Sequence, residues 1–150
     1  MIFRAATAED LPAIIAMLMD DELGKLREDF STPLDPAYLA AFEAIEHDPN
    51  QHLVVADRDG QVVGCFQLSF LAGLSHKGAW RGQIEGVRIA ASERGSGLGK
   101  AMMEWAIAQC RARGCRMVQL TTDKRRHDAH RFYERLGFAA SHEGMKLKLS

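Results

Sequence analysis

A short segment with three glycines and two cations, residues 94–100, constrains this chain more than any other feature. It lies between a strand-like run and a helix-like run. The glycines let the backbone turn tightly and expose its N–H groups, and the helix that begins near Leu98 points the positive end of its dipole at the same place. The segment therefore predicts an anion-binding loop. Its residues are Arg94, Gly95, Ser96, Gly97, Leu98, Gly99 and Lys100.

The spacing of these glycines excludes two common nucleotide loops. A P-loop requires a glycine five residues before Gly99 and a Ser or Thr after Lys100, where this chain has Arg94 and Ala101. A dinucleotide-binding fingerprint requires G-x-G-x-x-G near the start of a βαβ unit, whereas these glycines run G-x-G-x-G late in the chain. Neither a metal-bound triphosphate nor a dinucleotide is expected.

Two motifs resemble those of one enzyme family. The pattern Arg-x-x-Gly-x-Gly, formed by Arg94, Gly97 and Gly99, resembles the acetyl-coenzyme A loop of the GNAT superfamily of N-acetyltransferases. The run from Ala129 through Tyr133 to residue 138 is similar to the family's later A-x-x-F-Y-E-x-x-G-F segment. The resemblance extends over residues 2–149. It implies an acetyl-CoA-dependent N-acetyltransferase.

Composition is consistent with one enzyme domain spanning residues 1–150. The net charge of −1 gives no general attraction to nucleic acid or to an anionic membrane, and no apolar run is long enough to span one. The odd number of cysteines, Cys65, Cys110 and Cys115, favours reduced thiols. Because no apolar leader follows Met1, we expect a cytoplasmic protein.

Hydrophobic periodicity predicts alternating strands and helices. Strands are expected at 2–5, 53–56, 61–70, 83–89 and 116–120, with a hairpin joining 53–56 to 61–70. Helices are expected from the Thr7 capping box to about 20, and at 36–47, 98–113 and 128–136. Segments 138–140 and 145–149 are expected to close the fold as a hairpin. The fold class is α/β (α+β), a mixed, mostly antiparallel sheet flanked by four helices, as the resemblance also implies.

Acetyl transfer to an amine requires a base, because an alkyl ammonium has a pKa of about 10.4. Glu85 is the candidate, since GNAT relatives commonly have a glutamate at this position of the strand before the loop. Period-2 alternation places Gln83, Glu85, Val87 and Ile89 on one sheet face. Glu85 acts directly or through water, binds the substrate ammonium instead, or is a solvated strand residue.

The departing thiolate requires an acid, and Tyr133 is the candidate. A phenol can donate a proton to a thiolate, and the resemblance places this tyrosine beside the thioester sulfur. The alternative is that Phe132 and Tyr133 are a packed aromatic pair.

The resemblance implies further contacts with the coenzyme. Main-chain groups of Val87, Arg88 and Ile89 are expected to pair with the pantetheine arm and to polarise the thioester carbonyl. The family's frequent asparagine, seven residues before the tyrosine, is Arg126 here, so the pantetheine contact of that asparagine is not expected, and Arg126 or Lys124 is expected to reach the 3′-phosphate instead. The cofactor-binding set is completed by Ala129 and Phe132 from the second motif.

The acceptor is expected to be a small amine, such as an amino acid, a polyamine or an aminoglycoside-like compound. Carboxylates between the first two helices would attract its cation; they are Asp20, Asp21, Glu22, Glu28, Asp29 and Asp35. His127, Asp128 and His130 do not complete a recognisable metal site, so no metal is expected.

Two alternatives stay open at this stage. The acceptor could instead be a protein N-terminus or lysine, and the chain could be a non-catalytic acyl-CoA-binding sensor. Edge strands also make a homodimer reasonable.

Overall fold

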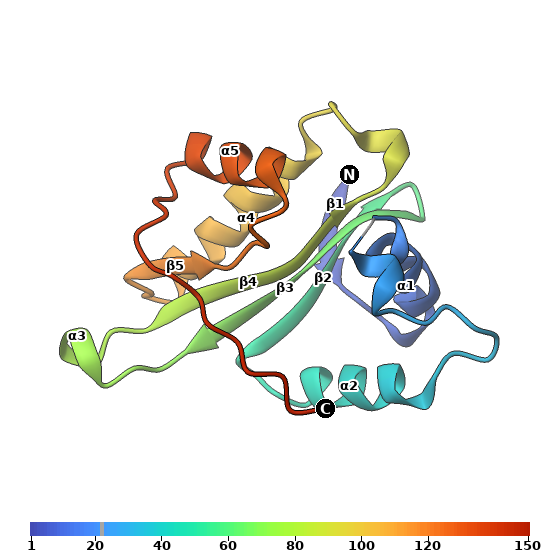
Figure 1. The fold of residues 1–150 in the computed structure, drawn as a ribbon, viewed down its shortest axis with the longest axis horizontal. Coiled ribbons are helices and arrows are strands. Elements are labelled where there is room, and N and C mark those ends of the chain that lie inside the picture. The colour runs from blue at the N-terminus through green and yellow to red at the C-terminus, as the bar shows by residue number, and fades with distance from the viewer. Residues whose placement is uncertain (22) are drawn as a thin grey trace.

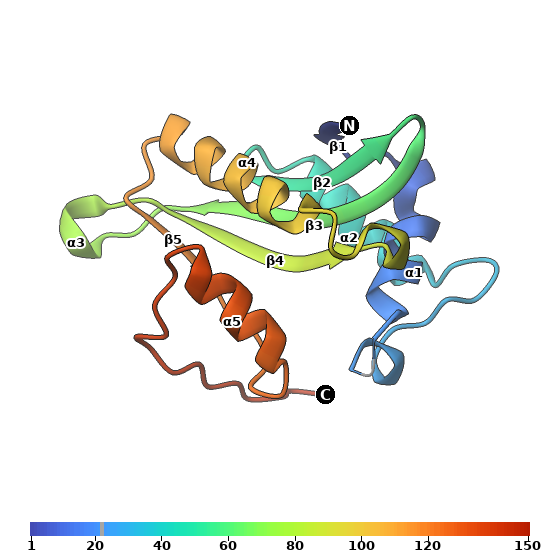
Figure 2. The ribbon, with the colours of Figure 1, turned by 90° about the horizontal axis from the view of Figure 1, so that it is seen from above.

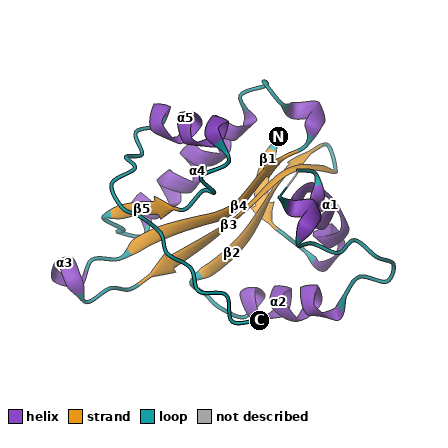
Figure 3. Cartoon of the chain, viewed as in Figure 1, coloured by secondary structure: helices purple, strands orange, loops and turns teal. Residues whose placement is uncertain are grey.

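One mixed five-stranded sheet organises the computed structural model, which describes residues 1–21 and 23–150 (Figures 1 and 3). The strand order is β1-β2-β3-β4-β5; neighbours are antiparallel except β4 and β5, which are parallel. The strands are β1 (Ile2–Ala5), β2 (Gln51–Arg58), β3 (Gln61–Leu71), β4 (Arg81–Ile89) and β5 (Met117–Leu120). The α-helices are α1 (Leu11–Met19), α2 (Pro36–Glu46), the short α3 (Ser75–Gly78), α4 (Leu98–Ala112) and α5 (His127–Arg135). The expected mixed α/β fold is confirmed.

Local turn and capping signals act as predicted at two places. The capping box between Thr7 and Asp10 opens a 3₁₀ turn, Ala8–Asp10, that leads into α1. The hairpin between β2 and β3 turns through Asp59 and Gly60, both with positive φ, which matches the right-handed twist of the strands. Further 3₁₀ turns span Gly24–Leu26 and Ala91–Glu93.

Helices lie on both faces of the sheet (Figures 1 and 2), and apolar side chains pack each layer against the strands. On one face, Met102, Met103 and Ala106 of α4 pack against the central strands, and side chains of α5 join this cluster. On the other face, α1 and α2 pack against β2 and β3. Among the described residues, no helix combines the length and apolar character needed to cross a bilayer.

A bulge at Gly86 changes which residues of β4 share a face. Gly86 has φ +61, and the pairing between β3 and β4 shifts register there. Val87 and Ile89 consequently pack against the α4-side cluster. Arg88 pairs with Cys65 of the cluster under α1. The expectation that Glu85, Val87 and Ile89 lie on one face is therefore wrong, because the bulge breaks the period of two.

The two parallel strands separate beyond the first half of β4. Pairing runs from Arg81 with Met117 to Ile84 with Leu120, and β5 then ends while β4 continues to Ile89. The β5-facing edge of 85–89 is thus left without a strand partner among the described residues. This opening leads directly into the glycine loop.

The predicted C-terminal hairpin is wrong. Residues 138–150 carry no strand, and Met145, Leu147 and Leu149 are 95%, 85% and 91% exposed. Phe138 instead closes α5: its N–H donates to the Tyr133 carbonyl at 3.1 Å, and its ring packs on the Tyr133 ring. Alternation shows that a segment can form a strand, but it does not supply an edge with which the segment can pair.

Candidate active site

The N-terminus of α4 presents the main-chain donors that the glycine loop predicts. Gly97 is the N-cap and has φ +88, a conformation that residues with a side chain rarely adopt. The first intrahelical bond comes from the Ala101 N–H, so the N–H groups of residues 98–100 precede it at the helix end. Ser96 Oγ accepts the Leu98 N–H at 3.3 Å. A Cβ built on Gly95 or Gly97 would meet nothing within 4 Å, so the loop leaves space for a diphosphate.

The two cations of the loop stay at the surface. Arg94 Nη2 lies 3.6 Å from Asp20 Oδ2, and Lys100 Nζ lies 3.8 Å from Glu104 Oε1, with all four side chains largely exposed. Surface pairs of this kind contribute little to stability. Both side chains are therefore available to an anion at the loop.

Close packing joins the loop to β4 and α5. A Cβ on Gly99 would lie 2.9 Å from Cδ1 of Ile89 and 3.4 Å from Cζ of Phe132. The glycine thus allows α4 to approach both elements. The Phe132 side chain packs against the core, and Ala129 lies half-buried one turn earlier in α5.

Tyr133 lies in an aromatic and electropositive setting. Its ring is edge-on to Phe132 at 5.1 Å and to Phe138 at 5.8 Å between centroids. Burial raises the pKa of the Tyr133 phenol, while the charges of Arg88 and Arg126 act in the opposite direction. The phenol is therefore protonated at neutral pH and can donate to an anion.

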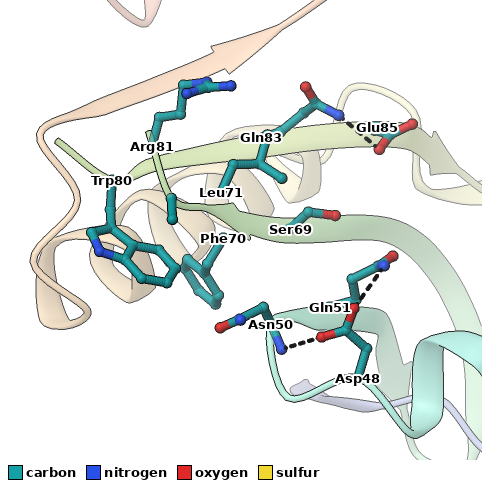
Figure 4. Close-up of a pocket in the computed structure, with 11 residues that line it drawn as sticks. Asp48, Asn50, Gln51, Ser69, Phe70, Leu71, Trp80, Arg81, Gln83 and Glu85 are labelled. Carbon is teal, nitrogen blue, oxygen red and sulfur yellow. Dashed lines mark hydrogen bonds between the residues drawn. The ribbon is translucent and has the colours of Figure 1, made fainter. Parts of the chain in front are cut away.

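Glu85 lies on the opposite sheet face from α4, at the rim of a pocket of about 480 Å³ (Figure 4). Gln83 Nε2 donates to Glu85 Oε1 at 3.0 Å, and the carboxylate is exposed. Trp80 and Phe70 line the far end of the same pocket. Glu85 belongs to β4 and Tyr133 to α5, so the two candidates come from different elements.

A row of amides that sequence reasoning missed flanks Glu85. Gln119 Nε2 donates to Gln83 Oε1, and Gln67 Nε2 donates to Gln51 Oε1, each at 3.0 Å. These glutamines come from four adjacent strands. The pairs join residues of different strands, Gln51 with Gln67 and Gln83 with Gln119, so no local sequence signal would have found them.

The carboxylates between α1 and α2 largely have protein partners. Asp21 accepts from Arg126 Nη1 and Nη2 at 3.3 and 3.4 Å and from the Gly24 N–H, and Asp35 caps α2. Glu28 accepts from the Tyr38 hydroxyl at 3.0 Å. The structure thus directs Arg126 to Asp21 across the opening. Glu22 lies outside the described residues.

Asp21 also lies beside the side chain of Arg88, for which the sequence predicts only a main-chain role. Arg88 Nε is 3.2 Å from Asp21 Oδ2. Arginine charges and the Gly24 N–H hold the pKa of Asp21 below its ordinary value, although desolvation acts to raise it. The carboxylate is therefore ionised at neutral pH and links β4 to the start of α5.

No three-residue group of potential metal-binding side chains gathers within residues 1–21 and 23–150. Asp128 instead pairs with Arg131, and His130 Nε2 lies 3.3 Å from the Asp123 carbonyl oxygen.

Comparisons with known proteins agree with this arrangement. Residues 15–138 match the acetyltransferase (GNAT) family. The chain is 35% identical over 139 residues to aminoalkylphosphonate N-acetyltransferase of Salmonella typhimurium, covering 93% of this chain and 85% of that protein. It is 36% identical over 90 residues to glucosamine 6-phosphate N-acetyltransferase of Trypanosoma brucei brucei, covering 60% of this chain and 59% of that protein.

A solved structure agrees over almost the whole chain. The crystal structure described as a transcriptional regulator from Bacillus halodurans C-125 has a TM-score of 0.96 and 47% identity, and the match covers 99% of each chain. The chain therefore belongs to the acetyltransferase (GNAT) family, enzymes that use acetyl-CoA as the acetyl donor.

Proposed function

We propose that this protein transfers an acetyl group from acetyl-CoA directly to the primary amine of a small molecule. The observation that carries the proposal is the continuity of the α4 N-terminus, the unpaired edge of 85–89 and Tyr133 around one opening. The relatives named above act, by their names, on an aminoalkylphosphonate and on glucosamine 6-phosphate. Both compounds are small amines that carry a phosphorus oxyanion.

The coenzyme would lie along this opening. N–H groups at 98–100 and the side chains of Arg94 and Lys100 would hold the pyrophosphate, and the free edge of 85–89 would take the pantetheine arm as an added strand. One main-chain N–H of this edge would donate to the thioester carbonyl. A donor of this kind stabilises the transition state by roughly 3 kcal/mol.

The transfer forms an N–C bond to the carbonyl carbon and breaks the C–S bond of the thioester. Glu85, directly or through water, would take a proton from the attacking amine, and Tyr133 would give its proton to the thiolate. The products are the acetamide and the coenzyme thiol, and one proton from the original ammonium passes to solvent. In these steps Glu85 would act as a general base and Tyr133 as a general acid.

The two buried cysteines, Cys65 and Cys110, favour direct transfer over an acyl-enzyme. Burial raises the pKa of the Cys65 thiol to about 12 and that of Cys110 to about 11, so neither is a thiolate at neutral pH. Covalent trapping of radiolabelled acetyl on a cysteine during turnover would contradict this step.

Replacing Glu85 with glutamine should lower kcat/KM for the amine by about 10²–10⁴, because the base is lost. Raising the pH should recover part of the rate, since more of the amine is then neutral. The measurement is thiol release followed between about pH 7 and pH 10, with Glu46→Gln in α2 as the control for losing an exposed carboxylate. A defect that is the same at every pH would assign Glu85 to substrate binding.

Thiol release measured with a panel of small amines and peptides also tests the two alternative functions, a non-catalytic acyl-CoA-binding sensor and an acetyltransferase that acts on proteins. A non-catalytic sensor would bind acetyl-CoA and release no thiol with any amine. Protein or peptide acceptors that exceed every small amine in kcat/KM would overturn the small-molecule assignment.

We further infer a homodimer in which the two copies exchange their C-terminal segments, residues 145–149, each adding as a strand to the β5 edge of the other copy. Residues 145–149 alternate apolar and lysine side chains, and the three apolar side chains lie in solvent. The segment passes the end of β5, where a Cβ on Gly144 would be 3.9 Å from Cγ2 of Thr121. β5 is itself a sheet edge. In a dimer, residues 145–149 of one copy would pair as a strand with the exposed β5 edge of the other copy.

Light scattering of the intact chain should give twice the monomer mass of 16.6 kDa. Truncation after Gly144 should give a folded monomer, because the removed side chains touch no core, with a melting temperature lowered only by the loss of the dimer contacts. Leu147→Asp should likewise dissociate the dimer, whereas Lys146→Asp should not. A monomeric intact chain, or a dimer that survives truncation, would rule out the exchange.

A further inference from the structure

Arg88 carries a buried donor that the protein itself does not satisfy. Its side chain is only 15% exposed, and Nη1 donates to the Val87 carbonyl at 2.8 Å. Nε is buried and forms no hydrogen bond within the described part of the chain, although Asp21 Oδ2 is 3.2 Å away. Asp21 therefore balances charge at Arg88 without completing its hydrogen bonding, which leaves the guanidinium group suited to bind a further anion.

Positive charge exceeds negative charge around this donor. Asp21 is the one carboxylate that touches both Arg88 and Arg126 among the described residues, and it also accepts the Gly24 N–H. The charges of Arg126 and Arg27 both lower the pKa of Arg88, as does its burial, while Asp21 acts to raise it. The carboxylate of Asp20 is directed to Arg94 instead. Within the described part of the site, both guanidinium groups therefore form their ion pairs with Asp21, and the carboxylate of Asp123 acts on the Arg126 side chain only through its charge.

The pair lies beside the proposed chemistry. Arg88 follows Glu85 on the same strand, past the Gly86 bulge that directs its side chain away from α4. Arg126 is the N-cap residue of the helix that carries Tyr133, and both arginines lie close enough to lower the pKa of the Tyr133 phenol. An acceptor amine placed between Glu85 and Tyr133 would have a second substituent within reach of this pair.

We propose that Arg88 and Arg126 bind the phosphonate or phosphate group of the acceptor, and that Asp21 holds the two guanidinium groups in position. The planar fork of arginine matches a tetrahedral oxyanion through two parallel N–H···O bonds. The acceptor anion would add a second counter-charge beside the carboxylate of Asp21, which Arg88 and Arg126 otherwise share. This inference rests on the proposed function, because it assigns the anionic end of the acceptor in the same site.

The test compares amines that differ only in the anion. Intact enzyme is assayed with 2-aminoethylphosphonate, 2-aminoethyl phosphate and 2-aminoethanol at saturating acetyl-CoA. The two phosphorus compounds should each exceed aminoethanol in kcat/KM by about 100-fold, since several charge-assisted hydrogen bonds are involved. Preference for only one of them identifies the acceptor as a phosphonate or a phosphate monoester.

Substitution then assigns the preference to these two residues. Arg88→Gln and Arg126→Gln should each lower the ratio of phosphonate to aminoethanol kcat/KM by about tenfold or more, through KM. Arg125→Gln, a neighbouring exposed arginine bound to Asp123, should leave the ratio unchanged. An unchanged ratio in both arginine variants would overturn the inference.

Two further outcomes distinguish acceptor binding from coenzyme binding and from failure of the proposed function. If Arg126→Gln raises KM for acetyl-CoA but not for its 3′-dephospho analogue, Arg126 binds the coenzyme phosphate and the acceptor assignment is wrong for that residue. If the intact enzyme acetylates aminoethanol as well as the phosphonate, the inference fails while the proposed function stands. Acetylation of no amine at all, with acetyl-CoA still bound, would contradict the proposed function itself.

Discussion

Gly97→Val should raise the KM for acetyl-CoA by about 100-fold or more, the largest effect on coenzyme binding that we expect from a single substitution. A β-branched residue is strained at φ +88, and its side chain would occupy the space in front of the helix N–H groups. The hydrogen bonds from residues 98–100 to the pyrophosphate would then be lost. Isothermal titration with CoA measures the same loss without catalysis.

The β2–β3 turn offers a matched control for the strain. Gly60 has φ +86 and, like Gly97, no atom within 4 Å of a built Cβ, but it lies far from the glycine loop in the chain. Gly60→Val should lower the melting temperature about as much as Gly97→Val does and leave CoA binding intact. Equal loss of CoA binding in both variants would mean that general destabilisation, and not the loop, is responsible.

Tyr133→Phe should lower kcat by about 10²–10⁴ while the KM for acetyl-CoA changes little. The substitution removes only the hydroxyl, so the ring contacts with Phe132 and Phe138 remain. The coenzyme thiolate would then leave without a proton donor. Steady-state kinetics at saturating amine separate the two parameters, and Tyr38→Phe, which removes the chain's other phenol, should keep kcat near its original value.

The pH dependence of kcat gives a second check on Tyr133. Because burial raises its pKa, the phenol keeps its proton up to and beyond the ordinary value of about 10. Intact enzyme should therefore show no fall in kcat between about pH 7 and pH 10. If kcat instead falls with rising pH well below about pH 10, and Tyr133→Phe shows the same fall, a group other than Tyr133 loses the essential proton. That result would contradict the acid role of Tyr133.

The glycine loop and the helix start that we propose for the coenzyme could be predicted because their determinants are local. The chain turns at Gly97, and α4 begins at Leu98 with its first N–H groups exposed. Each of these features depends only on neighbouring residues. The β2–β3 hairpin is predictable for the same reason, since Asp59 and Gly60 specify its turn.

The acceptor side could not be predicted in the same way, because it depends on contacts between distant residues. Arg126 and Asp21 are 105 positions apart, and no pattern near either one indicates their ion pair. The bulge at Gly86 likewise arises where β3 and β4 shift register, and it separates Glu85 from Val87 against the simple alternation. The alternation of residues 145–149 is typical of a strand, but pairing requires an edge that only tertiary structure or a second copy can supply.

The central claim is that acetyl passes from acetyl-CoA bound at the α4 N-terminus to a small amine without an enzyme-bound intermediate. The most direct measurement mixes intact protein with acetyl-CoA and 2-aminoethylphosphonate and follows free thiol, acetylated amine and protein mass together. We predict one thiol for each acetamide formed and no change in protein mass. Thiol release that is independent of the amine, or acetyl found on the protein, would contradict the account.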